Sequence, residues 1–432
     1  MSKLSDPLIL PCGQSIKNRI CKAAMTERIA MGNNFTNDKH IELYKMWGAG
    51  EIGILLTGNV QVHRGNLEGP ANVAIEEETY KEQMPMLKKW AEAATAEGSR
   101  LWMQISHAGR QTPGEINMNP MSPSDVQLKI PGRKYGKPIP MTEDDIQDVI
   151  NRFVFTAKIA RESGFDGIQL HSAHGYLLSQ FLSPDINLRT DEWGGSLENR
   201  ARLHLEIIKK CREEVGSDFA ISIKMNSADF QKGGFSPEDS IQVAKLFSDS
   251  GIDNIEISGG TYEQPRLLGL DKVSINPKRS ENRKESTIAR EAYFLSYAEE
   301  IAKVVNIPLM VTGGFRTKEG MESALSEGAC EIVGIGRPLC ANPFAIKELL
   351  AGQIDELPKY EKTLSIGPWP LSPASPFRLI QAINAFSAQA WFYQQIKKMG
   401  KGLMPDLSLK PWKAFRDDAK ADQEAVKEYQ NF

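Results

Sequence analysis

Eight short apolar runs recur along the chain, and most of them are separated by a longer amphipathic stretch. Runs that are apolar throughout are typical of parallel strands buried on both faces. Eight strands that alternate with helices indicate a closed (β/α)8 TIM barrel, an α/β fold, rather than an open doubly wound sheet. An open sheet with fewer strands is the alternative, because boundaries inferred from one sequence shift by a few residues. The expected strands are Arg19–Met25, Ile52–Thr57, Leu101–Ser106, Gly167–Leu170, Ala220–Met225, Ile252–Ser258, Pro308–Thr312 and Glu331–Ile335.

Helical patterns of suitable length lie between most of these strands. Three of them begin at a residue that can cap a helix N-terminus, namely Thr142, Ser196 and Ser236, and a proline follows Ser236 at the first helical position. The expected helices are Tyr80–Glu97, Glu143–Ser163, Leu197–Val215, Pro237–Ser250, Tyr293–Val305 and Lys318–Glu327.

Three segments exceed what a plain barrel requires. The opening stretch, residues 8–19, predicts an N-terminal hairpin that caps one mouth of the barrel. The connections 107–141 and 259–287 are long, are rich in Pro, Gly and Asn, and follow strands, so we expect both on the active face.

The pattern changes near residue 358. An aromatic-rich helix is expected around residues 376–398, and such aromatic surface usually packs on its own barrel. Contact with a second copy of the chain, or a cover over the substrate, is the alternative. We therefore expect a barrel domain, residues 1–358, and a helical C-terminal extension, residues 359–432, packed on it.

Composition excludes several function classes. Lys plus Arg number 52 and Asp plus Glu number 55, and this balance lacks the basic footprint of a nucleic-acid binder. No run approaches the roughly 18 apolar residues of a membrane span. The 5 cysteines are scattered and form no C-x-x-C pair, so free thiols are expected and no cysteine-held metal site. These features predict a cytoplasmic protein.

A short stretch with two histidines, His171-Ser-Ala-His174-Gly-Tyr176, follows the fourth expected strand, where barrel enzymes place catalytic groups. Two imidazoles can donate hydrogen bonds to an oxygen on which negative charge develops, and Tyr176 can donate a proton. A chance spacing with purely local hydrogen bonds is the alternative. A metal site is less favoured, because no carboxylate or third histidine stands beside the pair.

Two glycine turns end the seventh and eighth strands. Gly313 and Gly314 follow one, while Gly336 and Arg337 follow the other. Loops after these two strands form the usual phosphate site of a TIM barrel, so a phosphate-bearing ligand is favoured over two ordinary turns.

Two polar residues interrupt otherwise apolar strands. Lys224 either points into a site or lies at a solvated strand end, because lysine is seldom fully buried without a partner. Gln104, at the close of the third strand, can present its amide to a heterocycle.

Longer motifs carry a family resemblance. The run Gly167–Pro184 and its continuation Asn187–Arg200 resemble those of the old yellow enzyme family. Supporting motifs are Lys17–Ile20 and Gln104–Arg110, and the resemblance spans residues 8–350.

The resemblance implies a noncovalently bound flavin mononucleotide (FMN) at the top of the barrel. Thr26 lies where the family hydrogen-bonds the flavin O4, Gly58 where a backbone N–H meets the ring, and Gln104 where an amide reads the pyrimidine edge. Lys224 stands where a cation, commonly Arg, lies beside flavin N1 and O2. The cofactor-binding residues implied are Ala24, Met25, Thr26, Gly58, Gln104, Lys224, Gly313, Gly314, Gly336 and Arg337.

The resemblance also implies an activity. His171 and His174 match the pair that binds a substrate carbonyl or nitro oxygen, Tyr176 the proton donor, and Tyr262 is a weaker candidate for the pocket wall. NAD(P)H would reduce the flavin, which would then reduce the C=C bond of a small α,β-unsaturated carbonyl or nitro compound. The alternatives are a flavin dehydrogenase, oxidase or isomerase that acts on a biosynthetic intermediate, a non-flavin barrel lyase or hydrolase, and a binding protein. The motifs leave the oligomeric state open.

Overall fold

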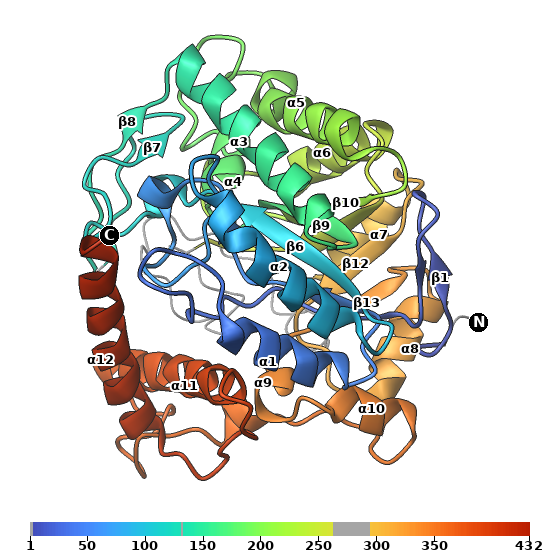
Figure 1. Ribbon diagram of the computed structural model, residues 1–432, viewed down its shortest axis with the longest axis vertical. Helices are drawn as coiled ribbons and strands as arrows, with labels where there is room; N and C mark the ends of the chain where they lie inside the picture. The colour runs from blue at the N-terminus through green and yellow to red at the C-terminus, as the bar shows by residue number, and fades with distance from the viewer. Residues whose placement is uncertain (1–2, 131–132, 262–293) are drawn as a thin grey trace.

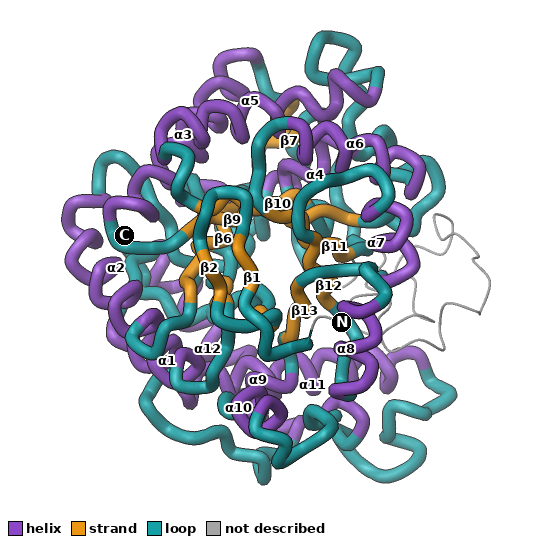
Figure 2. Tube along the Cα trace, turned by 90° about the vertical axis from the view of Figure 1, so that its right-hand side faces the viewer, coloured by secondary structure: helices purple, strands orange, loops and turns teal. Residues whose placement is uncertain are grey.

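The fold is a closed barrel of eight parallel strands with helices around it (Figure 1; Figure 2). The computed structural model describes residues 3–130, 133–261 and 294–432. Each strand pairs in parallel with the next, and the first strand also pairs with the last, so the ring closes and the predicted TIM barrel is confirmed. The barrel strands are β3 (Ile20–Lys22), β4 (Ile54–Leu56), β6 (Arg100–Ser106), β9 (Gly167–Ser172), β10 (Ala220–Asn226), β11 (Asn254–Ser258), β12 (Leu309–Thr312) and β13 (Ile332–Ile335).

Helices cover the outside of the barrel. The side chains of Thr142, Ser196 and Ser236 each accept a backbone N–H of the first turn, so the three predicted N-caps are confirmed. The helix over residues 38–48 was not predicted, although Asn37 caps it and three buried residues line one face. The outer helices are α1 (Asp38–Gly48), α2 (Tyr80–Thr95), α3 (Glu143–Glu162), α5 (Leu197–Val215), α6 (Pro237–Asp249), α7 (Leu295–Ala302) and α8 (Lys318–Ser326).

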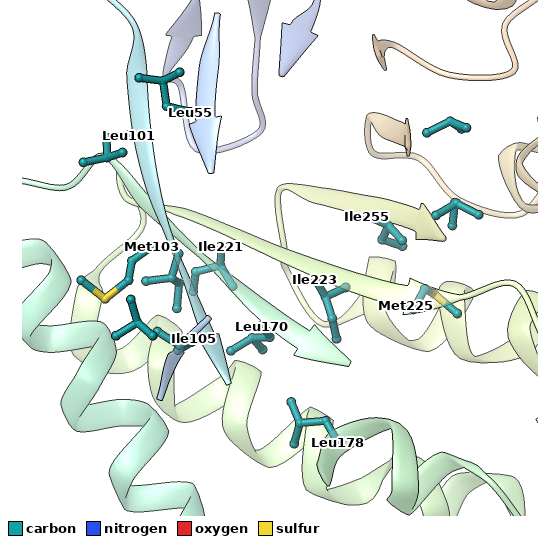
Figure 3. Close-up of a cluster of buried hydrophobic side chains, with 14 of the residues drawn as sticks. Leu55, Leu101, Met103, Ile105, Leu170, Leu178, Ile221, Ile223, Met225 and Ile255 are labelled. Atoms are coloured by element: carbon teal, nitrogen blue, oxygen red, sulfur yellow. The ribbon is translucent and has the colours of Figure 1, made fainter. Parts of the chain in front are cut away.

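Side chains alternate between the two faces of the strands. Leu101, Met103 and Ile105 of β6 belong to the large cluster that packs the barrel against its helices (Figure 3). Trp102 of the same strand belongs instead to a smaller apolar cluster inside the barrel. That inner cluster also contains Cys21, Ile54, Leu56, Ala220, Met310 and Ile332.

The N-terminal mouth of the barrel is closed by the predicted hairpin, β1 (Leu8–Ile9) and β2 (Ser15–Ile16). Its residues Leu10 and Ile16 are fully buried in the inner apolar cluster. The Gln14 amide donates to the backbone oxygens of Asp166 (2.6 Å) and Asp218 (3.1 Å), which precede β9 and β10. The lower interior is therefore apolar and covered by the hairpin, which favours the other end of the barrel for a polar ligand.

The C-terminal mouth carries the irregular segments. The short strand β5 (Val60–Gln61) extends the ring beside the upper part of β6. The connection 107–141 holds a two-stranded ribbon, β7 (Met121–Ser122) and β8 (Ile139–Pro140). Short helices here are η1 (Arg64–Asn66), η2 (Gly109–Gln111) and α4 (Leu177–Leu182).

The chain beyond the last strand forms α9 (Pro338–Ala341), α10 (Ala345–Leu350), η6 (Tyr360–Lys362), α11 (Arg378–Met399) and α12 (Pro411–Gln430). The α11 helix packs against α1, α9 and α12 (Figure 1). The α12 helix reaches the active-face loops, where Arg28 pairs with Asp418 at 3.0 Å and Arg64 donates to the Tyr429 backbone oxygen at 2.9 Å. Within the described ranges no helix is long and apolar enough to cross a membrane.

Candidate functional site

The predicted site residues gather at one end of the barrel, around the C-terminal ends of its strands. Ala24, Met25 and Thr26 follow β3, and Gly58 follows β4. The residues within strands are Gln104 (β6), His171 (β9) and Lys224 (β10), and those that follow β9, β12 and β13 are His174, Tyr176, Gly313, Gly314, Gly336 and Arg337. Tyr262 lies outside the described residues.

His171, His174 and Tyr176 form one cluster at the end of β9. The ring centroids of His171 and His174 lie 5.2 Å apart, and those of His171 and Tyr176 lie 4.7 Å apart, both pairs edge-on. The chain turns back sharply, because His174 has φ 61° and Gly175 has φ 82°. A left-handed conformation is uncommon for a residue other than glycine and persists only where the surroundings hold it.

Three hydrogen bonds hold the turn at His174. Its backbone N–H donates to Asn226 Oδ1 at 3.1 Å, and its Nε2 lies 2.9 Å from Ser258 Oγ. The Gln111 amide donates to its backbone oxygen at 3.1 Å. Asn226 is itself fixed, since its Nδ2 donates to Asp229 at 2.8 Å. These bonds fix the second histidine ring relative to the first.

Both histidine rings are neutral at physiological pH. Burial, with the nearby Lys224 charge as the next cause, lowers the pKa of His171 and of His174 well below 6.5. The Nδ1 atom of His171 accepts the Ala173 N–H at 3.3 Å, so the proton of this neutral ring is on Nε2. His171 therefore has one N–H to donate to a ligand oxygen.

A chain of polar side chains crosses the upper interior. Gln104 Nε2 donates to Gln169 Oε1 at 2.7 Å, and Gln169 Nε2 donates to Glu256 Oε2 at 2.9 Å. Glu256 Oε1 pairs with Lys224 Nζ at 2.9 Å. Lys224 is buried and faces the barrel interior, so the alternative of a solvated strand end does not hold.

The glycine turns after β12 and β13 are shaped as a cradle. Gly313 and Gly314 have φ of 125° and 91°, which favour glycine. A Cβ on Gly336 would make ordinary contact with Met25, whose Sδ would lie 3.6 Å away, and would clash with nothing. Thr312 Oγ1 is buried without a hydrogen-bond partner among the described residues.

An acidic residue that the sequence did not single out lies beside Gly58. Glu27 Oε1 accepts the Gly58 backbone N–H at 2.7 Å and the Tyr44 hydroxyl at 2.5 Å. A Cβ on Gly58 would lie 2.6 Å from the Met25 backbone oxygen and 2.1 Å from Glu27 Oε2, and the backbone contact cannot be relieved by a side-chain movement, so only glycine fits there. This N–H, expected to meet a flavin ring, has an acceptor within the chain.

Sequence patterns also missed Gln169, Asn226, Glu256 and Ser258. Each lies in a strand and is almost fully buried. The signal was a polar residue at every second position of three consecutive strands, which marks one polar face of an otherwise apolar strand. The described residues contain no group of three His, Cys, Asp or Glu placed to hold a metal ion.

Comparison with known proteins decides the family. Residues 3–356 match the model of the "NADH:flavin oxidoreductase / NADH oxidase family". The chain belongs to this family. This family match confirms the resemblance predicted from the motif after β9 and assigns the chain to the flavin oxidoreductases.

Relatives in the family are similar over much of the chain. The "NADH-dependent flavin oxidoreductase iccE" of Talaromyces variabilis is 32% identical over 92% of this chain and 98% of its own length. The "NADH-dependent flavin oxidoreductase iliE" of Neonectria sp. is 34% identical, but the chain spans only 46% of that protein. The solved old yellow enzyme homologue from Zymomonas mobilis has a TM-score of 0.67 at 23% identity, over 82% of this chain and 94% of that one, and supports the fold.

The residues of this NADH:flavin oxidoreductase family member fit an FMN. Gly313 and Gly314 have positive φ angles of the kind found in turns whose backbone N–H groups bind a phosphate, and Gly336 follows the next strand. The buried Thr312 Oγ1, which has no hydrogen-bond partner among the described residues, adds a polar group. Lys224 and Gln104 supply a cation and an amide for the polar edge of a flavin ring.

Proposed function

We propose that the protein is an FMN-dependent NAD(P)H oxidoreductase that reduces the activated C=C bond of α,β-unsaturated carbonyl or nitro compounds. The observation that carries the proposal is the cluster of neutral His171 beside His174 and Tyr176 at the open end of the barrel. The family match supports the flavin chemistry, and the names of relatives support NADH as a donor.

The proposed cofactor site has two parts. Gly313, Gly314, Gly336 and Arg337 would hold the phosphate. Ala24, Met25, Thr26, Gly58, Gln104 and Lys224 would lie beside the ring. Residues 1–358 would form this catalytic barrel, with residues 359–432 as an extension.

Bound FMN supplies the hydride in this proposal. His171 donates its Nε2–H to the substrate oxygen, and His174 binds the same oxygen from the adjacent edge. These hydrogen bonds strengthen as negative charge develops on that oxygen, so they stabilise the transition state more than the bound substrate. Tyr176 delivers its hydroxyl proton to the α-carbon.

An anaerobic stopped-flow experiment on Tyr176→Phe tests the proposal. Reduction of the bound flavin by NADH or NADPH should stay near the wild-type rate, whereas its reoxidation by an enone such as 2-cyclohexenone should slow by about 100-fold or more. Tyr80→Phe, on α2 away from the cluster, is the matched control and should match the wild type in both halves.

An equal loss of rate in flavin reduction and in flavin reoxidation would contradict the role of Tyr176 as proton donor. A purified protein without a flavin absorption spectrum, and without FMN binding on addition, would overturn the whole proposal. Flavin reduction by a saturated ketone without NAD(P)H would instead indicate a dehydrogenase.

A further inference from the structure

Glu256 is a buried carboxylate in the row of polar side chains that runs from Gln104 to Lys224, and no sequence motif explains it. It lies in the middle of β11 and is fully buried. It accepts a hydrogen bond from Gln169 at one oxygen and forms an ion pair with Lys224 at the other. Burying a carboxylate is costly unless it is paired and hydrogen-bonded, and here both conditions are met. Its position between two predicted ring contacts, Gln104 and Lys224, indicates a function at the site.

The carboxylate fixes the direction of every hydrogen bond in the chain. An ionised carboxylate only accepts, so Gln169 must present its NH2 group to Glu256. The second N–H of that group is used by Ser222 Oγ at 3.3 Å. The carbonyl oxygen of Gln169 must then accept, and Gln104 must donate to it.

This direction leaves Gln104 in one orientation. Its Nε2 is turned toward Gln169, and no described residue donates to its Oε1. The free carbonyl oxygen is complementary to a ring N–H, and the second amide hydrogen is complementary to a ring carbonyl. This adjacent acceptor and donor match the N3–H and C2=O edge of a flavin.

Glu256 also balances charge. Lys224 would be an unpaired buried cation without it, since the two are opposite each other in the β10–β11 register. The histidines nearest to Lys224 are neutral and add no positive charge. The paired lysine therefore stabilises a negative charge on a reduced flavin less than an unpaired lysine would.

We propose that Glu256 is a positioning residue that orients the Gln104 amide toward the flavin N3–H and moderates the Lys224 charge, and thereby sets both FMN affinity and flavin reduction potential. The inference rests on the proposed function, because it takes FMN as the ligand.

Glu256→Gln is the first test. A glutamine can donate as well as accept, so the direction of the hydrogen bonds from Gln104 through Gln169 is no longer fixed. Lys224 also loses its counter-charge. We expect the FMN dissociation constant to rise at least tenfold, measured by fluorescence titration of the apoprotein. We expect the oxidised–reduced equilibrium, measured with a reference dye, to shift at least tenfold toward reduced flavin, or about 30 mV for a two-electron couple.

Two further variants separate the parts of the inference. Glu331→Gln, a partly buried carboxylate that accepts the Leu309 N–H at 2.7 Å at the start of β12, is the matched control and should change neither quantity. Gln169→Leu removes the hydrogen bonds that link Gln104 to Glu256 but keeps the charges of Glu256 and Lys224. It should therefore weaken FMN binding, and it should change the reduction potential less than Glu256→Gln does.

Unchanged affinity and potential in Glu256→Gln would overturn the inference, while FMN binding by the wild type would leave the proposed function standing. A wild type that binds no FMN would overturn both. If Glu256→Gln does not fold, Lys224→Met is compared with Lys224→Met/Glu256→Gln. The double variant should have the higher potential, and equal potentials would refute the charge effect.

Discussion

A second lysine, Lys22, lies buried on the outer face of the barrel and makes stability depend on pH. It is fully buried in β3, where its Nζ donates to the backbone oxygens of Ala23 (3.1 Å) and Leu56 (2.5 Å) and lies 4.5 Å from the Trp47 ring. Burial lowers its pKa from 10.5 to about 8, although the Glu27 charge acts in the opposite direction.

The size and sign of the effect follow from this shift. A difference of 10.5 minus about 8 corresponds to about 3 kcal/mol between the two protonation states. Between these two values the unfolded chain binds a proton that the folded chain has lost, so the free energy of unfolding rises with pH. From pH 7 to pH 9 the gain is about 1 kcal/mol, because the folded lysine has mostly lost its proton by pH 9.

Lys22→Met should abolish this gain, because methionine keeps the apolar contact with Trp47 and does not titrate. The measurement is urea unfolding of wild type and variant at both pH values. The unfolding free energy of the wild type minus that of the variant should be about 1 kcal/mol larger at pH 9 than at pH 7. Lys88→Met, exposed on α2, is the control and should follow the wild type. A wild-type minus Lys22→Met difference that is the same at both pH values would refute the reasoning.

Three further substitutions test the site and its supports. Asn226→Ala removes the acceptor of the His174 N–H, so kcat/KM with an enone should fall about tenfold in steady-state assays, or about 1.4 kcal/mol. Gly334→Ala places a Cβ 1.9 Å from Thr312 Oγ1 and should lower the free energy of unfolding by about 1–3 kcal/mol in urea titrations, with partial rescue by Thr312→Ala. Arg28→Ala removes the ion pairs with α12, so limited proteolysis should cut that helix sooner than in the wild type, and equal rates would contradict its anchoring role.

The barrel was predictable from the sequence because its strands are buried on both sides and read as apolar runs. The boundaries of the strands were less predictable. For β3, a strand was expected over Arg19–Met25, and only Ile20–Lys22 pairs as a strand. The α1 helix was missed because its apolar residues Leu43, Tyr44 and Trp47 are recognised as one buried face only once the Asn37 cap fixes the helix start.

The site was predictable where one segment carries the signal. His171, His174 and Tyr176 are close in sequence, so one motif contains them all. Glu256 and Gln169 act through partners on other strands, and only the register between strands brings them together. One sequence does not specify that register, which depends on the closed ring.

The contacts of α12 have a consequence for synthesis. Arg28 binds residues 390 and 394 positions later, and Arg64 binds one that is 365 positions later. At about 5–20 residues per second, a ribosome needs roughly 20–80 s to cover that distance. The loop that carries Thr26 and Arg28 therefore lacks its contacts with α12 until α12 has left the ribosome. This part of the active face is therefore completed long after its first residues are made.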